Sequence, residues 1–136
     1  MSDTFFAAKE ALCRGFEEFL LIGAVGGRFD HSLGNLSLLL YLDSSGKHAL
    51  LADDYSVMEI VSKRPSEILP DYPYFSLLAV DGEARDVTVE NALYPLSGAV
   101  ISPDFAYGVS NEPLPGKKAR VTVGKGRLLL VCVREE

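Results

Sequence analysis

The spacing of apolar residues changes near Tyr55, and this change constrains the fold more than any other feature of the 136-residue sequence. Before Tyr55, apolar side chains recur every three to four residues or form short unbroken runs, which is typical of helices and buried strands. After Tyr55, they alternate with polar residues in short segments separated by turn-forming residues, as in antiparallel sheets. The sequence therefore predicts an α+β chain, with an α/β part in residues 1–56 and a β domain in residues 57–136.

The first part of the chain predicts the order helix, strand, loop, helix, strand. Apolar positions three to four apart favour helices over residues 3–14 and from Leu33 onward, and residues 43–46 should end the second helix. Unbroken apolar runs at residues 19–22 and 49–52 predict strands that are buried on both faces. This order predicts an incomplete Rossmann-like α/β segment.

The second part of the chain predicts an antiparallel β-sandwich or a jelly-roll-like sheet. Gly124, Lys125 and Gly126 separate the last two apolar segments, and we expect them to close a hairpin. The predicted strands are residues 57–61, 74–78, 87–89, 99–101, 120–123 and 128–133.

Charge and composition exclude several classes of protein. A formal net charge of −6 argues against a general nucleic-acid-binding surface, because phosphate backbones are usually bound by a basic face. The sequence has no apolar run of the length of a transmembrane helix and no signal-peptide pattern at its N-terminus. We therefore expect a cytoplasmic protein with no membrane partner. Cys13 and Cys132 lack metal-ligand spacing and are expected to be buried free thiols.

The loop between the first predicted strand and the second helix has the sequence GAVGGRFDHSLGNL. Gly23, Gly26 and Gly27 would let the backbone approach a phosphate closely, and a helix N-terminus directs N–H groups at such a ligand. Arg28 offers a planar donor fork for phosphate oxygens, and Asp30 offers an oxygen ligand for Mg²⁺. An alternative stays open: the glycines only turn the chain, Asp30 caps the helix and Arg28 pairs with a nearby carboxylate.

The same loop resembles the GGRxDHxxxN signature of thiamin pyrophosphokinases, the enzymes that transfer a pyrophosphoryl group from ATP to thiamin. Four further segments, and the expected terminal hairpin, resemble the family and occur in the family's order. Asn91 stands where glycine is common, and Ser2 stands where threonine is usual. The four segments are residues 2–15, 74–78, 87–96 and 108–112.

The resemblance implies where ATP and Mg²⁺ bind. Asp3 would hold Mg²⁺ or its waters, and Asp30 would do the same or orient the attacking hydroxyl; with Arg28 they would form the catalytic set. Gly26, Gly27 and Arg28 would face the phosphates of ATP. The hydroxyl of thiamin would then attack the β-phosphorus, with positioning and charge neutralisation as the main sources of catalysis.

The resemblance also implies which residues bind thiamin. Ser110 and Asn111 would form hydrogen bonds with the pyrimidine ring, although the same residues also fit an ordinary polar turn before Pro113. His31 would pass a proton or, alternatively, make a structural hydrogen bond at the helix start. Asn35 lies four residues later, on the same helical face, and would hold the substrate or the loop.

Family members are homodimers in which the α/β lobe of one chain and the sandwich of the other form the thiamin site. The resemblance thus implies a homodimer. Family members also begin with a further α/β stretch that carries a D-x-D motif, so the resemblance implies a truncated form of the enzyme. Two alternatives are a catalytically inert thiamin-binding or dimerisation module and an unrelated β-rich interaction domain.

Overall fold

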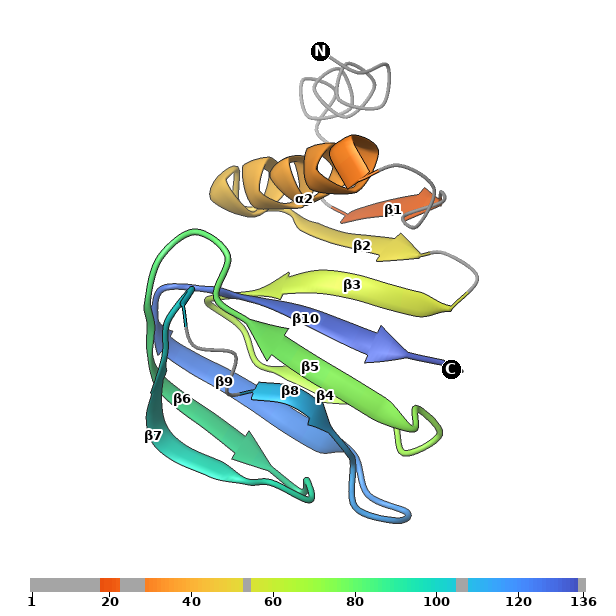
Figure 1. Ribbon diagram of the computed structural model, residues 1–136, viewed down its shortest axis with the longest axis vertical. Helices are drawn as coiled ribbons and strands as arrows, with labels where there is room; N and C mark the ends of the chain where they lie inside the picture. Colours follow the sequence, from red (N-terminus) through yellow and green to blue (C-terminus); the bar gives the residue numbers. More distant parts are fainter. Residues whose placement is uncertain (1–17, 23–28, 53–54, 105–107, 135–136) are drawn as a thin grey trace. The chain divides into compact units, whose positions relative to one another are not determined.

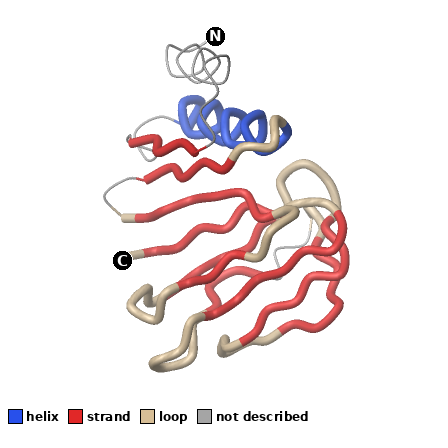
Figure 2. The backbone as a smooth tube through the Cα atoms, turned by 180° about the vertical axis from the view of Figure 1, so that it is seen from behind, coloured by secondary structure: helices blue, strands red, loops and turns tan. Residues whose placement is uncertain are grey.

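The computed structural model describes residues 18–22, 29–52, 55–104 and 108–134. The chain divides into two compact units, residues 1–54 and 55–136, and each unit is described here by itself. Figure 1 labels the helix and strands, and Figure 2 shows the same backbone from behind. The predicted helix over residues 3–14 and the predicted thiol of Cys13 lie outside the described residues.

The first unit contains two parallel strands and the helix between them. Strand β1 (Glu18–Ile22) is paired along its whole length with β2 (His48–Ala52), and α2 (Phe29–Ser44) connects the two. The helix packs on β2, and its buried side chains are Leu38, Leu39 and Leu42. Both predicted strands and the predicted second helix are therefore confirmed, and together they form one βαβ unit.

The burial of β1 differs from the prediction. Leu20 is 63% exposed, so the expectation of a strand buried on both faces is wrong at this residue. In β2 the buried residues alternate, with Ala49 and Leu51 buried and their neighbours half-buried. An unbroken apolar run indicates which residues tolerate burial, but it does not indicate how many layers cover the strand.

The predicted end of the second helix is confirmed in its hydrogen bonds. The Gly46 N–H donates to Asp43 O at 2.9 Å, and the Lys47 N–H donates to Leu42 O at 3.0 Å. Gly46 has φ +76°, so this is the left-handed glycine cap, in which N–H groups beyond the helix donate to carbonyls of its last turn. The helix begins at Phe29, directly after the glycine-rich loop.

The second unit consists of two antiparallel sheets that face each other (Figure 1). The predicted antiparallel sandwich is therefore confirmed. The six predicted strands are all present, but the sequence did not predict β4 and β8, which are short and rich in polar residues. In spatial order, one sheet holds β3 (Ser56–Val61), β10 (Leu128–Val133), β5 (Tyr74–Leu78) and β8 (Gly108–Asn111), and the other holds β4 (Ser66–Ile68), β9 (Ala119–Lys125), β6 (Ala84–Glu90) and β7 (Leu96–Ile101).

The core of this unit is built from alternate residues of both sheets. Phe75 and Leu130 from one sheet and Val87 and Val121 from the other are almost fully inaccessible and belong to one cluster. Burying such a side chain stabilises the fold by about 1.5–3 kcal/mol. The period-two spacing seen in the sequence is therefore the pattern of two inner faces that pack on one another.

The last two strands do not form the expected hairpin, and this prediction is wrong. Strand β9 pairs with β4 and β6, whereas β10 pairs with β3 and β5, so the chain crosses from one sheet to the other at Gly126. Two alternating segments joined by glycines look the same in the sequence whether they pair or separate. Their partners are fixed by other strands, far away along the chain.

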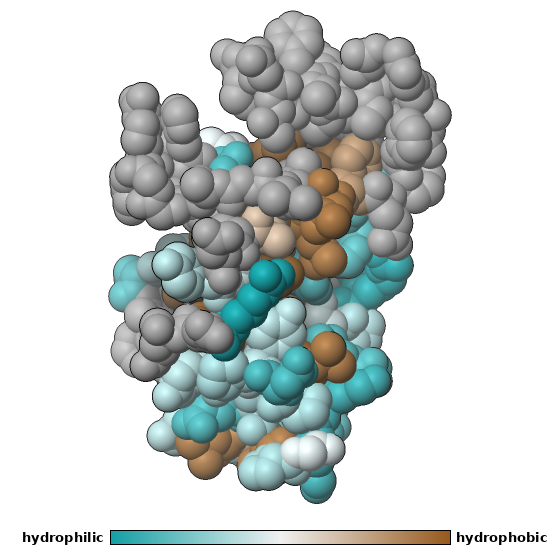
Figure 3. Space-filling model, turned by 90° about the vertical axis from the view of Figure 1, so that its right-hand side faces the viewer, coloured by the Kyte–Doolittle hydropathy of each residue, from teal (hydrophilic) through white to brown (hydrophobic). Residues whose placement is uncertain are grey.

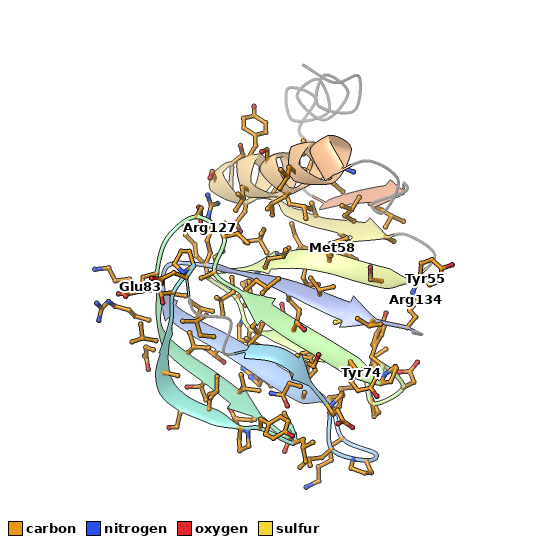
Figure 4. All side chains as sticks on the ribbon, in the orientation of Figure 1. Tyr55, Met58, Tyr74, Glu83, Arg127 and Arg134 are labelled. Atoms are coloured by element: carbon orange, nitrogen blue, oxygen red, sulfur yellow. The ribbon has the colours of Figure 1, made fainter. Side chains whose placement is uncertain are left out.

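The crossing brings the chain close to the connection between β5 and β6. Gly126 has φ +85°, and a Cβ atom there would lie 2.5 Å from the carbonyl oxygen of Glu83. Next to it, Arg127 donates through Nε and Nη2 to Oδ2 of Asp81, at 2.7 and 2.6 Å. Figure 4 labels Glu83 and Arg127 at this corner. Only glycine fits the crossing, and an ion pair holds it.

Gly126→Ala should therefore destabilise the second unit for two reasons, the left-handed backbone and the steric clash of the new Cβ atom with Glu83 O. Gly116 is the matched control, because it has φ +71° but no atom within 4 Å of its Cβ position. We expect Gly116→Ala to cost about 1 kcal/mol and Gly126→Ala to cost about 1–3 kcal/mol more, because the backbone of Glu83 must move. Urea unfolding followed by circular dichroism measures both, and equal midpoints would contradict the close approach.

Candidate functional site

The predicted site residues fall into three groups. Ser110 and Asn111 lie in the second unit, in β8, and Asn35 lies in the first unit, in α2. For Asp30 and His31 the structure describes the helical backbone, in the first turn of α2. Outside the described residues lie Asp3, Gly26, Gly27 and Arg28.

The start of α2 has the backbone features of an anion site. The first turn of a helix leaves N–H groups without a helical partner and carries partial positive charge. Asp30 and His31 are the second and third residues of this helix, and the half-buried Asn35 follows one turn after His31. His31 and Asn35 are thus four residues apart in one helix, and their shared role at the site stays a prediction.

Among the residues that the structure describes, Asn111 is the polar residue classed as buried, with 5% of its surface exposed. Its Oδ1 accepts hydrogen bonds from the N–H groups of Tyr94 and Glu112, both at 2.9 Å. Its Nδ2 donates to the carbonyl oxygen of Tyr94 at 2.8 Å. The side chain thus joins β8 to the segment that follows β6, and it satisfies three backbone groups that regular pairing leaves without partners.

Two of the segments that carried the family resemblance meet at Asn111. The Leu93 N–H donates to Glu112 O at 2.8 Å, and the Leu114 N–H donates to Asn91 O at 2.9 Å. A single bridge between Ala92 and Pro113 lies between these bonds. Residues 91–94 and 111–114 therefore form one irregular pair, although the sequence places them in separate motifs.

Asn91 explains one departure from the family pattern. Its backbone has φ +59°, the left-handed conformation that glycine adopts most readily and asparagine tolerates better than most residues. Its Nδ2 also donates to Lys118 O at 3.2 Å. An asparagine where glycine is common therefore preserves the turn.

Ser110 has an unusual backbone conformation and an exposed side chain. Its φ is +59°, and its N–H donates to Oγ of Ser76 on the neighbouring strand β5 at 2.9 Å. The register between β5 and β8 shifts between Phe75 and Leu77, on either side of Ser76. The sequence analysis missed Ser76, and the available signal was its place as the polar residue of the strand YFSLL.

The surface near this pair offers both apolar and polar groups. Leu93 is 48% exposed and Tyr94 is 62% exposed, although both are large and apolar or aromatic. On the face of the second unit that Figure 3 shows, apolar side chains form small separate patches within a largely hydrophilic surface. Residues 91–94 and 110–114 therefore combine an aromatic ring, an aliphatic side chain and a serine hydroxyl, which suits a small ligand with a ring and polar substituents.

The described residues hold neither a reactive cysteine nor a metal cluster. Burial inside the sandwich and the nearby negative charge of Glu59 raise the pKa of the Cys132 thiol to about 12. Cys132 is free and buried, as predicted. Within the described ranges, His, Cys, Asp and Glu side chains form no group of three or more that could bind a metal ion. No helix there has the length and apolar character that a membrane span requires.

Comparison with known proteins places most of the second unit in a described family. Residues 58–128 match the family described as "Thiamin pyrophosphokinase, vitamin B1 binding domain". A segment of 49 residues is 43% identical to thiamine pyrophosphokinase 1 of rice, Oryza sativa subsp. japonica, and covers 36% of this chain and 18% of the rice protein.

Solved structures with the same fold carry related names. Thiamine pyrophosphokinase from Bacillus subtilis superposes with a TM-score of 0.91 at 23% identity, over 100% of this chain and 64% of that chain. The Geobacillus thermodenitrificans protein gives a TM-score of 0.83 at 24% identity, over 99% of this chain and 62% of that one. At these identities the likeness shows the fold, and this chain spans less than two thirds of either protein.

The raised pKa predicts how Cys132 behaves in alkaline solution. At pH 8 the folded protein should leave Cys132 unmodified by iodoacetamide, whereas the unfolded chain reacts, because the thiolate is the nucleophile. The folded state keeps the thiol protonated up to a higher pH than the unfolded state does. Its contribution to the free energy of unfolding is therefore fully present below pH 9, the ordinary pKa of the thiol, and is lost as the pH rises toward 12.

Two measurements check this prediction. Peptide mass spectrometry separates Cys132 from Cys13, and urea unfolding between pH 8 and 11 compares the wild type with Cys132→Ala. The free energy of unfolding should fall more steeply with pH in the wild type than in the variant. Parallel curves, or rapid labelling at pH 8, would contradict the assignment.

Proposed function

The chain belongs to the thiamin pyrophosphokinase family, and we propose that it takes part in transferring a pyrophosphoryl group from ATP to thiamin. The observation that carries the proposal is the family match over residues 58–128. That range contains Ser76, Ser110, Asn111 and the exposed residues Leu93 and Tyr94, which meet at one end of β8. The second unit is therefore the thiamin-binding domain in this proposal, with its boundary near residue 57.

On the thiamin side, Ser110 and Asn111 are the proposed binding residues. The exposed hydroxyl of Ser110 both donates and accepts, which suits the ring nitrogens and the amino group of the pyrimidine. Both lone pairs of Asn111 Oδ1 are already used within the protein, so its remaining Nδ2 hydrogen is the group that a ligand could bind.

On the phosphate side, the proposal uses the loop before α2 and the first turn of that helix. Gly26, Gly27 and Arg28 would face the phosphates, because they directly precede the helix start at Phe29. Asp3 and Asp30 would hold Mg²⁺, whose bound charge would offset the charge of the phosphate oxygens. His31 and Asn35 would hold the substrate hydroxyl or the loop. The βαβ unit supports a Rossmann-like lobe here.

The proposed reaction breaks one bond and forms one. The hydroxyl oxygen of thiamin attacks the β-phosphorus of ATP, the bond from that phosphorus to the α–β bridging oxygen breaks, and AMP leaves. Arg28 would stabilise the negative charge that shifts to the phosphate oxygens during this step. Thiamin diphosphate is the product, and the hydroxyl proton passes to His31 or to water. We further propose a cytoplasmic homodimer, with a site shared between two chains.

A second candidate is a thiamin-binding or dimerisation module without turnover. The family match favours it in one respect, because residues 58–128 correspond to the vitamin-binding domain alone. The two candidates differ in ATP binding and product formation, and they agree on thiamin binding.

Calorimetry with thiamin and then with Mg-ATP, followed by an assay for AMP and thiamin diphosphate, tests both candidates. The enzyme should bind both substrates and form both products, and Arg28→Ala should lower its turnover about 10²–10³-fold while leaving thiamin affinity unchanged. A module should bind thiamin and form no product. A chain that binds neither substrate would contradict both candidates.

A further inference from the structure

Ser110 adopts a backbone conformation that it would not adopt alone. Its φ of +59° lies in the left-handed region, where a residue with a Cβ atom is disfavoured. Such conformations persist when the surrounding structure holds them, and they are concentrated at binding sites. The groups that hold Ser110 therefore decide where its hydroxyl lies.

The first of these groups is the Ser76 hydroxyl. Its Oγ accepts the N–H of Ser110 itself at 2.9 Å. Phe75 and Leu77, the residues on either side of Ser76, are buried at 0% and 1% exposure, so β5 is fixed in the core. Because strand side chains alternate, Ser76 points to the opposite face. It offers an acceptor on a rigid strand at the point where the register with β8 shifts.

The second group is the Asn111 amide. It is buried, and its Oδ1 and Nδ2 hold the N–H of Glu112 and both backbone groups of Tyr94. The peptide that follows Ser110 is thereby tied to residues 91–94. Ser110 is therefore held on both sides: Ser76 accepts its own N–H, and the side chain of Asn111 fixes the residue that follows it.

We propose that Ser76 is a positioning residue and that Asn111, besides the ligand contact proposed above, has the same positioning role: together they hold Ser110 in its left-handed conformation and so set the place of its hydroxyl against thiamin. Ser76 acts through Ser110 without touching the substrate. The inference rests on the proposed function, since it assumes that Ser110 binds thiamin. If the anchors are removed, the binding-competent conformer becomes a smaller fraction of the population, and the apparent affinity falls by that fraction.

Ser76→Ala removes the first anchor and leaves the core contacts of β5 in place. We expect its thiamin dissociation constant to rise about 2- to 10-fold, the range set by the loss of one hydrogen bond. Ser76→Thr keeps the hydroxyl and should restore the affinity. The matched control is Ser97→Ala, on the exposed surface of β7 in the other sheet, which should bind as the wild type does.

Amide hydrogen exchange gives a reading that does not depend on thiamin. The N–H of Ser110 should exchange faster in Ser76→Ala than in the wild type, while the amides of β9 and β10 keep their protection. A purely structural role would accelerate exchange throughout the sheet and leave the affinity of the folded protein unchanged. An unchanged exchange rate at the Ser110 N–H would overturn the positioning role of Ser76.

A double-mutant cycle separates positioning from direct contact. If Ser76 acts through Ser110, then Ser76→Ala should have almost no effect on thiamin affinity in a Ser110→Ala background. Additive losses would show that Ser76 contacts thiamin independently and would overturn its positioning role.

The second anchor is tested with Asn111→Asp, which keeps the two acceptor bonds and loses the donor to Tyr94 O. Asn91→Asp is its control, because Asn91 also loses one Nδ2 bond to a backbone carbonyl and lies in the segment that pairs with residues 111–114. Thiamin binding that is weaker in Asn111→Asp than in Asn91→Asp, and that is no longer weakened by Asn111→Asp in a Ser110→Ala background, supports the inference, whereas a loss that persists in that background would show that Asn111 acts by direct contact and would overturn its positioning role. Equal thiamin affinities of Asn111→Asp and Asn91→Asp would overturn the positioning role of Asn111.

The outcomes also separate this inference from the function on which it rests. If the wild type binds no thiamin, the proposed function fails, and the positioning role fails with it. If the wild type binds thiamin and Ser76→Ala binds it equally well, only the positioning role fails.

Discussion

The second unit depends on the packing of β9 and β10 into one core from opposite sheets. These strands are neighbours in the sequence, yet each is hydrogen-bonded on both sides in its own sheet. Val121 in β9 and Leu128 and Leu130 in β10 are inaccessible members of the same cluster. The short crossing at Gly126 and the ion pair between Arg127 and Asp81 therefore hold together the two strands on which both sheets are assembled.

The candidate thiamin surface lies where this regular order ends. Strand β8 has four residues and stands last in its sheet, and its register with β5 is irregular. A short edge strand has few ladder bonds to hold it. Side-chain hydrogen bonds supplement them here: Ser76 Oγ accepts the N–H of Ser110, and Asn111 Oδ1 accepts the N–H groups of Tyr94 and Glu112. The irregularity frees Ser110 from sheet geometry, while the rigid core behind β5 keeps it in place.

The sequence was informative wherever a local pattern decides the structure. Alternation located six strands, and the glycine at residue 46 located the end of α2, because both depend on residues close together in the chain. Pairing was not predictable, since β9 and β10 find their partners 30 or more residues away. The exposure of Leu20 was missed for the same reason: an apolar run does not state what covers it.

The site shows a similar division. The family motif predicts Ser110 and Asn111 as binding residues, whereas their different surroundings, one exposed and one buried, follow from the fold. Asn91 illustrates why a motif tolerates some changes and not others. A glycine there would supply the left-handed turn alone, whereas asparagine supplies the turn and also a hydrogen bond to Lys118 O. The backbone conformation is what this position requires, and the side chain adds a tie between the segment after β6 and the start of β9. A residue without left-handed tolerance would strain this turn and with it the segment that Asn111 holds through Tyr94, and it would thereby act on the proposed thiamin surface without contacting thiamin.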